Sequence, residues 1–379
     1  MSYKPKSLNN PFVEYGYKGP EYFCDREQEV AQLISALHNE SNVALISPRR
    51  IGKSGLIHHA FHLIREQSPD IACIYIDILN TRSQKDFIDA FASEVIAALG
   101  GNLQTALKKA ASFFKGFRPT ITFDEFSGAP TFSFHVEHSK ESNTIEQIFK
   151  YIHQSGKRCY IAFDEFQQIT NYPEPGLEAL LRSQIQFVDN AYFVFAGSQQ
   201  HLMSEMFLSA NRPFYLASQI MNIDVIEENK YRDFASTMFR KQDRQISEET
   251  FHQIYTVVDG QTWYIQTILH QLYIMSEEPL NTETANKAID ILLNKYATAF
   301  SNYYLSLTNN QAMLLRAVAK EGIVKEPLAK NFMNKHQLPA LSSTRQALSA
   351  LEKKQFIYKT DAGYIVYDRF LSLWLRNRT

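Results

Sequence analysis

The stretch ALISPRRIGKSGL, residues 44–56, decides the fold of this chain. An apolar run at 42–46 leads into it and predicts a buried parallel strand, and residues 54–66 predict the helix that follows. A tight turn between such a strand and such a helix, closed by Gly-Lys-Ser, is typical of a loop that cradles phosphates, because free N–H groups and the helix dipole face the anion. The stretch therefore predicts an α/β fold with a nucleotide site.

Each residue type in this loop suits that chemistry. Gly52 lets the backbone approach the phosphates, Lys53 reaches the β- and γ-phosphates, and the Ser54 hydroxyl ligates Mg²⁺. Ser47 stands where glycine or alanine is usual, and its small side chain is tolerated if φ is negative there. We expect ATP to bind along the whole loop, at Ser47, Pro48, Arg49, Arg50, Ile51, Gly52, Lys53, Ser54 and Gly55.

A second motif, RCYIAFDEFQQI, supports the first. Residues 158–163 predict another apolar strand, which ends in Asp164 and Glu165. Asp164 would hold Mg²⁺ through water, and Glu165 would orient or deprotonate the attacking water. The alternative is a lysine on a surface turn and a solvated strand end, but the two motifs occur in the expected order, each at the end of an apolar strand.

Two further polar residues follow predicted strands. Ser198 ends AYFVFAGSQ, where it would sense the γ-phosphate, or alternatively be a satisfied strand-end hydroxyl. Arg212 precedes the strand QIMNIDVI and would stabilise transition-state charge on the nucleotide of a neighbouring subunit. Such a role in trans would imply an oligomer, and a monomer or dimer is the alternative.

Several segments of the chain together resemble the archaeal-type ATPases of the AAA+/STAND group of P-loop NTPases, over nearly the whole length. The resemblance implies an AAA+-like parallel-sheet core, a helical lid and a C-terminal winged helix-turn-helix. It also implies that Phe23, Arg26 and Glu27 help to frame the adenine. The matching segments are YFCDREQEVAQL, SPRRIGKSGL, YIAFDEFQQI, VFAGSQ and YDRFLSLWLR.

The chain departs from the family pattern at two places. Leu216 and Ala217 stand where the family carries glycine and arginine, so one trans-acting arginine is lost. Gln261 and Thr262 replace a His-Pro pair in the lid segment GQTWYIQ, which weakens the expected contacts from lid to nucleotide. We therefore expect Mg²⁺-dependent hydrolysis that is slow or depends on a partner.

The remaining pattern predicts the domain organisation. Residues 1–225 form the ATPase core, with a β-hairpin insertion at about 112–140. We expect this hairpin to cover the sheet edge, and the alternative is a projecting hairpin that touches a partner. His135 and His138 in this insertion are an HxxH pair without a third metal ligand. Residues 226–303 have helical periodicity and form the lid.

Residues 304–379 predict the winged helix, with helices at 309–321, 325–335 and 341–354 and then a hairpin that turns at TDAGY. In a DNA-binding version, Arg345 and Gln346 would reach bases in the major groove. Lys353, Lys354 and Lys359 would contact phosphates. The alternatives are a protein-interaction module and a solvated basic face.

Charge and composition narrow the function classes. Residues 306–379 hold 12 Lys and Arg against 5 Asp and Glu, so they carry about +7 while the rest carries −8. Three scattered cysteines suggest neither disulfides nor a zinc site, and no apolar run is long enough for a membrane helix, so a cytoplasmic protein is expected.

Three functions remain open: an ATP-hydrolysing switch coupled to the winged helix, a DNA-binding regulator that uses ATP as a ligand, and a scaffold with a degenerate site. The first is favoured, with ATP or ADP as ligand and DNA or a protein as partner of the winged helix. The sequence names no partner.

Overall fold

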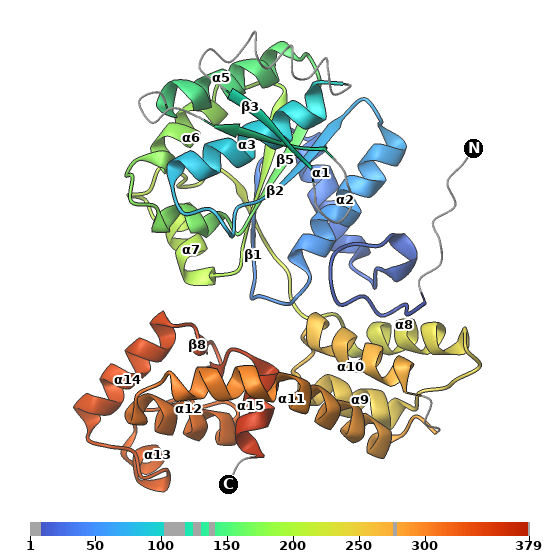
Figure 1. Cartoon of the computed structure of the whole chain (residues 1–379), viewed down its shortest axis with the longest axis vertical. Coiled ribbons are helices and arrows are strands. Elements are labelled where there is room, and N and C mark those ends of the chain that lie inside the picture. Colours follow the sequence, from blue (N-terminus) through green and yellow to red (C-terminus); the bar gives the residue numbers. More distant parts are fainter. Residues whose placement is uncertain (1–8, 102–117, 124–129, 136–140, 276–278, 378–379) are drawn as a thin grey trace. The chain divides into compact units, whose positions relative to one another are not determined.

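The computed structural model describes residues 9–101, 118–123, 130–135, 141–275 and 279–377 (Figure 1). These residues form two compact units. One unit contains residues 15–226, and the other contains 227–379 together with the described residues of 1–14.

The first unit is built on a five-stranded sheet in the order β2-β5-β6-β1-β7, and all neighbouring strands are parallel. The strands sit where the apolar runs predict them. They are β1 (Val43–Ile46), β2 (Ala72–Asp77), β5 (Cys159–Asp164), β6 (Ala191–Gly197) and β7 (Gln219–Asn222).

Helices cover both faces of this sheet, which explains why its central strands are apolar throughout (Figure 1). Val43 and Leu45 of β1 belong to the core beneath α1 and α2, whereas Ala44 and Ile46 belong to the core on the other face. The helices and short 3₁₀ turns are η1 (Pro20–Tyr22), α1 (Glu27–His38), α2 (Lys53–Gln67), α3 (Gln84–Leu99), α5 (Glu141–Gln154), η3 (Phe166–Asn171), α6 (Leu177–Ile185) and α7 (Gln200–Leu208).

The strand order brings three loops to one edge. Because β1, β5 and β6 are parallel and adjacent along the sheet, the residues after Ile46, Asp164 and Gly197 all lie at its carboxyl edge. The two predicted motifs and Ser198 are therefore neighbours in space.

The insertion contains the predicted hairpin, formed by antiparallel strands β3 (Arg118–Phe123) and β4 (Pro130–His135). That it covers the sheet edge stays a prediction. The hairpin is a separate two-stranded sheet whose β4 runs beside α3, and it does not hydrogen-bond to the edge strand β2 in the described residues. Of the HxxH pair, neither the His135 side chain nor His138 is among the described parts, and the described residues contain no metal-binding cluster of His, Cys, Asp or Glu.

The second unit is helical and ends in a small hairpin. Side chains cap several of its helices: Ser247 accepts from Thr250 N, and Asn281 and Thr308 each form a capping box. Its elements are α8 (Glu228–Arg240), α9 (Glu248–Val257), α10 (Thr262–Ile274), α11 (Thr282–Leu305), α12 (Asn309–Glu321), α13 (Lys330–Lys335), α14 (Leu341–Lys353), β8 (Ile357–Thr360), β9 (Gly363–Val366) and α15 (Arg369–Arg376).

The segment at residues 9–14 belongs to this helical unit and not to the core, where the sequence pattern placed it. Phe12 is fully buried, with its ring 5.0 Å from that of Phe239 and 5.8 Å from that of Tyr273. Asn10 adds a hydrogen bond from its side-chain amide to the carbonyl of His270. An aromatic contact across more than 200 residues has no local sequence signal.

The winged helix follows the predicted order, with one shortened helix. The middle helix was expected at 325–335 but begins at Lys330. Val324 instead pairs with Tyr364 of β9, donating and accepting one backbone hydrogen bond each at 2.9 and 2.8 Å. This extended pairing, followed by Pro327, delays the helix.

Among the described helices, none combines the length and apolar character that crossing a bilayer requires.

Candidate nucleotide site

The loop after β1 leads into α2, and the N-terminus of this helix has no side-chain cap, which we call a bare helix start. Gly52 is the N-cap of α2 with φ of 105°, a left-handed conformation that favours glycine. No side chain caps α2, so its first N–H groups remain available to an anion. Lys53 is 5% exposed, and its Nζ donates to the carbonyls of Ser47 and Pro48 at 2.8 and 2.7 Å. The lysine thus lies folded into the loop that it would leave to reach a phosphate.

Lys53 is the strongly perturbed cation of this loop. Burial lowers its pKa to about 8, against the opposing attraction of Glu165 and Asp164. An anionic ligand beside the ammonium would reverse this effect, because it would compensate the desolvated charge.

Ser47 meets the condition under which it replaces glycine. It is absent from the residues of positive φ, so its side chain causes no backbone strain. The residue is 1% exposed, and its Oγ has no hydrogen-bond partner. A buried hydroxyl without a partner is rare and costs stability unless a ligand satisfies it.

Asp164 is the centre of the second motif. Its Oδ2 accepts a short hydrogen bond from the Ser54 hydroxyl and one of 2.5 Å from the Tyr75 hydroxyl. Its Oδ1 accepts from the backbone N–H of Glu165 at 2.9 Å. The loop and the second motif are therefore joined directly. Tyr75 was missed by the sequence analysis, although it lies on β2 two residues before the strand ends.

Glu165 is held by a polar network. It has φ of 56°, and its Oε2 accepts from Gln167 Nε2 at 2.5 Å and from the Ser198 hydroxyl at 2.6 Å. Arg49 Nε donates to the same hydroxyl at 3.2 Å. Ser198 thus links the loop arginine to the carboxylate predicted to activate water.

These residues fit ATP with Mg²⁺. The bare helix start and Lys53 suit phosphate oxygens, and the orphaned Ser47 hydroxyl offers one further donor. Ser54 and Asp164 supply the hard oxygen ligands that Mg²⁺ prefers.

Phe23, Arg26 and Glu27, which were predicted to frame the adenine, have different surroundings in the structure. Arg26 is buried and donates to the carbonyls of Ile51 and Asp224 at 3.0 and 2.6 Å. These two hydrogen bonds stabilise the conformation of the loop. Phe23 instead lies beside the loop, with its ring stacked on His59 at 4.3 Å. A Cβ placed on Gly55 would lie 3.5 Å from this ring. Glu27 lies in the first turn of α1.

Arg212 is engaged on its own unit. Its guanidinium forms a short ion pair with Glu178 of α6 and a second contact of 3.6 Å with Glu205 of α7. Burial raises the pKa of Glu178 despite this arginine. None of these partners belongs to the loop at 47–55.

In the second unit, Gln261 has a structural partner. Arg369 is buried and forms an ion pair with Asp259 at 3.1 Å while donating to the Val366 carbonyl at 3.2 Å. Gln261, with its amide oriented to satisfy both groups, accepts from Nε and Nη2 of Arg369 at 3.2 Å. The Tyr264 hydroxyl also accepts from the backbone N–H of Arg369. We call these residues the Arg369 joint, which ties α10 to α15 of the winged helix.

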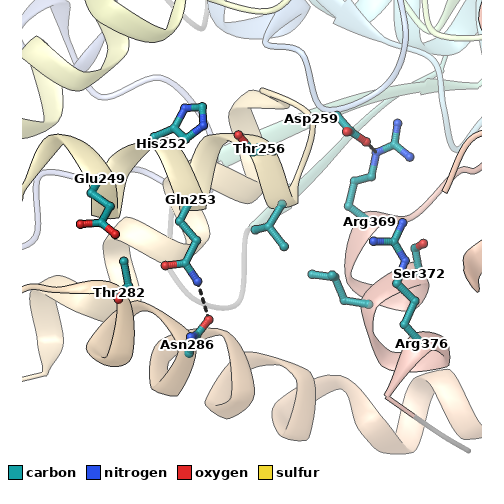
Figure 2. A pocket seen from close by; sticks show the side chains of 12 residues that line it. Glu249, His252, Gln253, Thr256, Asp259, Thr282, Asn286, Arg369, Ser372 and Arg376 are labelled. Atoms are coloured by element: carbon teal, nitrogen blue, oxygen red, sulfur yellow. Dashed lines mark hydrogen bonds and ion pairs between the residues drawn. The ribbon is translucent and has the colours of Figure 1, made fainter. Parts of the chain in front are cut away.

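A cavity of about 670 Å³ lies beside this joint, between α9, α11 and α15 (Figure 2). Figure 2 shows Arg369 reaching Asp259 on one side, and Gln253 reaching Asn286 on the other. Several lining side chains thus bond to one another, and none of the predicted site residues lines it.

The winged helix exposes part of its predicted DNA surface. Arg345 and Gln346 are exposed on α14, as are Lys353 and Lys359 beyond them. Thr344 is buried and donates to the Pro339 carbonyl, so it is unavailable to a base.

Comparisons with known proteins agree with this fold and site. A family model described as an ATPase domain predominantly from Archaea matches residues 23–268, and a model of a winged helix domain matches residues 298–377. An uncharacterised ATP-binding protein of Methanocaldococcus jannaschii is 23% identical over 290 residues, which cover 69% of this chain and 76% of that protein.

Two solved structures share the fold across almost the whole chain. The Walker-type ATPase of Pyrococcus abyssi has a TM-score of 0.66 at 16% identity and covers 97% of this chain and 99% of its own. The ORC2 protein of Aeropyrum pernix has a TM-score of 0.63 at 13% identity, with 97% and 95% covered. The phosphate loop, the parallel sheet and the matched family model lead to one assignment: the chain belongs to the family of ATPase domains found predominantly in Archaea, with a winged helix after the ATPase domain.

Proposed function

We propose that this protein is a Mg²⁺-dependent ATPase that acts as a switch, coupling its nucleotide state to the winged helix. The observation that carries the proposal is the direct hydrogen bond between Ser54 of the loop and Asp164 of the second motif. It brings the predicted phosphate site and the predicted metal site together. Residues 15–225 serve as the core, residues 226–303 as a lid on which the segment at 9–14 packs, and residues 304–379 as the winged helix.

Each residue has a part in binding. The N–H groups at the start of α2 and Lys53 bind the phosphates, with Lys53 exchanging its two carbonyl partners for the β- and γ-phosphate oxygens. Ser54 and Asp164 hold the metal, which when bound supplies positive charge to the phosphate oxygens.

Hydrolysis depends on Glu165, which orients the water that attacks the γ-phosphorus and accepts its proton while the bond to ADP breaks. In the structure its Oε2 is occupied by Ser198 and Gln167. A γ-phosphate that draws Ser198 and Arg49 toward itself would remove one of these two donors, so Ser198 acts as the phosphate sensor.

The experiment is ATP turnover by wild type, Lys53→Ala and Glu165→Gln, with ATP binding measured in parallel. We expect Lys53→Ala to lose both, and Glu165→Gln to bind ATP while turnover falls by about 10²-fold or more. Turnover that persists in Glu165→Gln would reject the assigned base. ATP binding without turnover in wild type would leave a nucleotide-gated switch, and no binding would mean a scaffold.

A trans role for Arg212 requires it to leave Glu178 and Glu205. If Arg212 acts in trans, specific turnover should rise with protein concentration. The Arg212→Ala variant should not show this rise. Equal specific turnover at all concentrations would assign Arg212 to its local ion pairs.

For the winged helix we propose DNA as the partner, on the basis of exposed Arg345 and Gln346 and the basic charge of this region. A structural neighbour, the ORC1 protein of Aeropyrum pernix, was solved in complex with DNA and has a TM-score of 0.56 at 13% identity, with 98% of this chain covered. Duplex binding should weaken steeply with salt and weaken further in Arg345→Ala. Turnover stimulated by DNA would favour the switch, and DNA binding that ATP controls without turnover would favour the regulator.

A further inference from the structure

Tyr75 contacts the carboxylate that the proposed function assigns to the metal. Its hydroxyl lies 2.5 Å from Asp164 Oδ2, the same oxygen that accepts from Ser54. With Glu165 N–H on Oδ1, three donors from three different segments surround one buried carboxylate. An ionised carboxylate accepts about four hydrogen bonds, so Asp164 keeps room for a further partner.

The sheet register explains how Tyr75 arrives there. Strands β2 and β5 pair in parallel, with Tyr75 opposite Ala162 and Asp77 opposite Asp164. Side chains two residues apart on a strand share a face, so Tyr75 lies diagonally across from Asp164, within reach of a long side chain. No shorter residue at position 75 would span that diagonal.

His58 supports the tyrosine ring from the other side. It lies on α2 one turn after Ser54, and its ring centroid is 4.1 Å from that of Tyr75. Burial lowers the pKa of His58, which favours the neutral ring against the tyrosine. The Tyr75 hydroxyl donates to Asp164 Oδ2 at 2.5 Å. The contacts with His58 and Asp164 together restrain rotation of the Tyr75 ring.

We propose that Tyr75 is a positioning residue: its hydroxyl fixes the orientation of the Asp164 carboxylate and so sets the Mg²⁺ affinity of the nucleotide complex. This inference rests on the proposed function and deepens it. Two donors on Oδ2, one from the loop and one from β2, restrain rotation of the carboxylate. Removing the β2 donor leaves Ser54 and the backbone of Glu165 to restrain it. Partners that orient a metal ligand typically change metal affinity by 10–100-fold.

The test is a Mg²⁺ titration of the binding of a non-hydrolysable fluorescent ATP analogue. In Tyr75→Phe we expect the analogue to bind as in wild type in EDTA, while the Mg²⁺ concentration at half-maximal tightening rises about tenfold. His58→Leu should give a smaller rise in the same direction, because it loosens the ring but keeps the hydroxyl.

Two controls separate the outcomes. Tyr192→Phe removes a hydroxyl from the neighbouring β6, where it donates to the Asp189 carbonyl at 2.8 Å, and should leave the titration unchanged. Ser54→Ala should shift it strongly. If Ser54→Ala shifts the titration and Tyr75→Phe matches wild type, the inference about Tyr75 is wrong and the proposed function stands. If wild type itself shows no Mg²⁺ dependence, the proposed metal site fails.

Discussion

Lys53 of the first unit and Arg369 of the second unit are both buried cations, and they are satisfied differently. Arg369 of the second unit has a carboxylate, a side-chain amide and a backbone carbonyl as partners within hydrogen-bonding distance. Lys53 of the first unit is bonded to two backbone carbonyls of its own loop, and burial depresses its pKa. Removing one partner of a satisfied buried charge destabilises a fold, whereas an undercompensated charge is available to a ligand. This comparison distinguishes a structural arginine, Arg369, from Lys53, the lysine that we propose binds phosphate.

Replacing Lys53 should have the largest effect and is the strongest test of this comparison. Lys53→Ala should lower ATP affinity by about 100-fold or more, since a buried charge that meets phosphate is worth several kcal/mol. The free energy of unfolding of the nucleotide-free protein should not fall, because the cost of burying the charge disappears. Calorimetric binding and thermal unfolding check both, with Lys85→Ala, a lysine paired with Asp89 on α3, as control. A strongly destabilised Lys53→Ala protein would contradict the assignment.

The opposite result is expected at the Arg369 joint. Arg369→Met should lower the free energy of unfolding of the second unit by about 2 kcal/mol, because Gln261 and the Val366 carbonyl lose a charged donor. Asp259 is 57% exposed and returns to water, which limits the loss. The control is Arg345→Met, at an exposed arginine of α14 in the same unit. Urea unfolding measures both variants. Equal losses of unfolding free energy would show that the Arg369 joint contributes no more to stability than an exposed arginine does.

The depressed pKa of Lys53 predicts a pH dependence of opposite sign for binding and for stability. Its pKa is about 8 folded against 10.5 ordinarily, so above pH 8 the unfolded chain binds more protons. The free energy of unfolding of the nucleotide-free protein therefore gains from this group as pH rises from about 8 to 10.5. ATP affinity should fall by up to about tenfold between pH 7 and 9, as the ammonium loses its proton. In Lys53→Arg both trends should disappear, since arginine stays charged. A parallel decline of affinity in both proteins would assign the titration elsewhere.

The smallest effect is expected at Ser47. Ser47→Ala removes a buried hydroxyl without a partner, so the nucleotide-free protein should become more stable by up to about 1 kcal/mol. If the hydroxyl meets a phosphate, ATP affinity should fall by a few-fold at the same time. Thermal unfolding with and without ATP measures both. A loss of stability without nucleotide would mean that the hydroxyl is satisfied in the free protein.

Much of the site could be predicted because its signals are local. The loop at 47–55 and the pair Asp164 and Glu165 each occupy consecutive positions after an apolar strand. The family resemblance and the parallel core followed from the same segments, and the matched family model confirms both. The roles of these residues remain predictions until turnover is measured.

Other features could not be predicted because they depend on distant pairing. Tyr75 looks like an ordinary strand residue until the register of β2 against β5 places it across from Asp164. Gln261 looks like a departure from a lid motif until Arg369, more than 100 residues away, meets its amide. The middle helix of the winged helix begins late because Val324 pairs with β9.

The sequence by itself determined the phosphate loop, the order of strands and helices, and the winged helix at the end, because apolar runs, helical periodicity and glycine turns act over a few residues. Only the tertiary structure decided which side chains complete the carboxylate of Asp164, where residues 9–14 pack, and how α10 is tied to α15. The physical reason is that hydrogen bonds and ring contacts between distant segments depend on sheet register and helix packing, which no short stretch of sequence specifies.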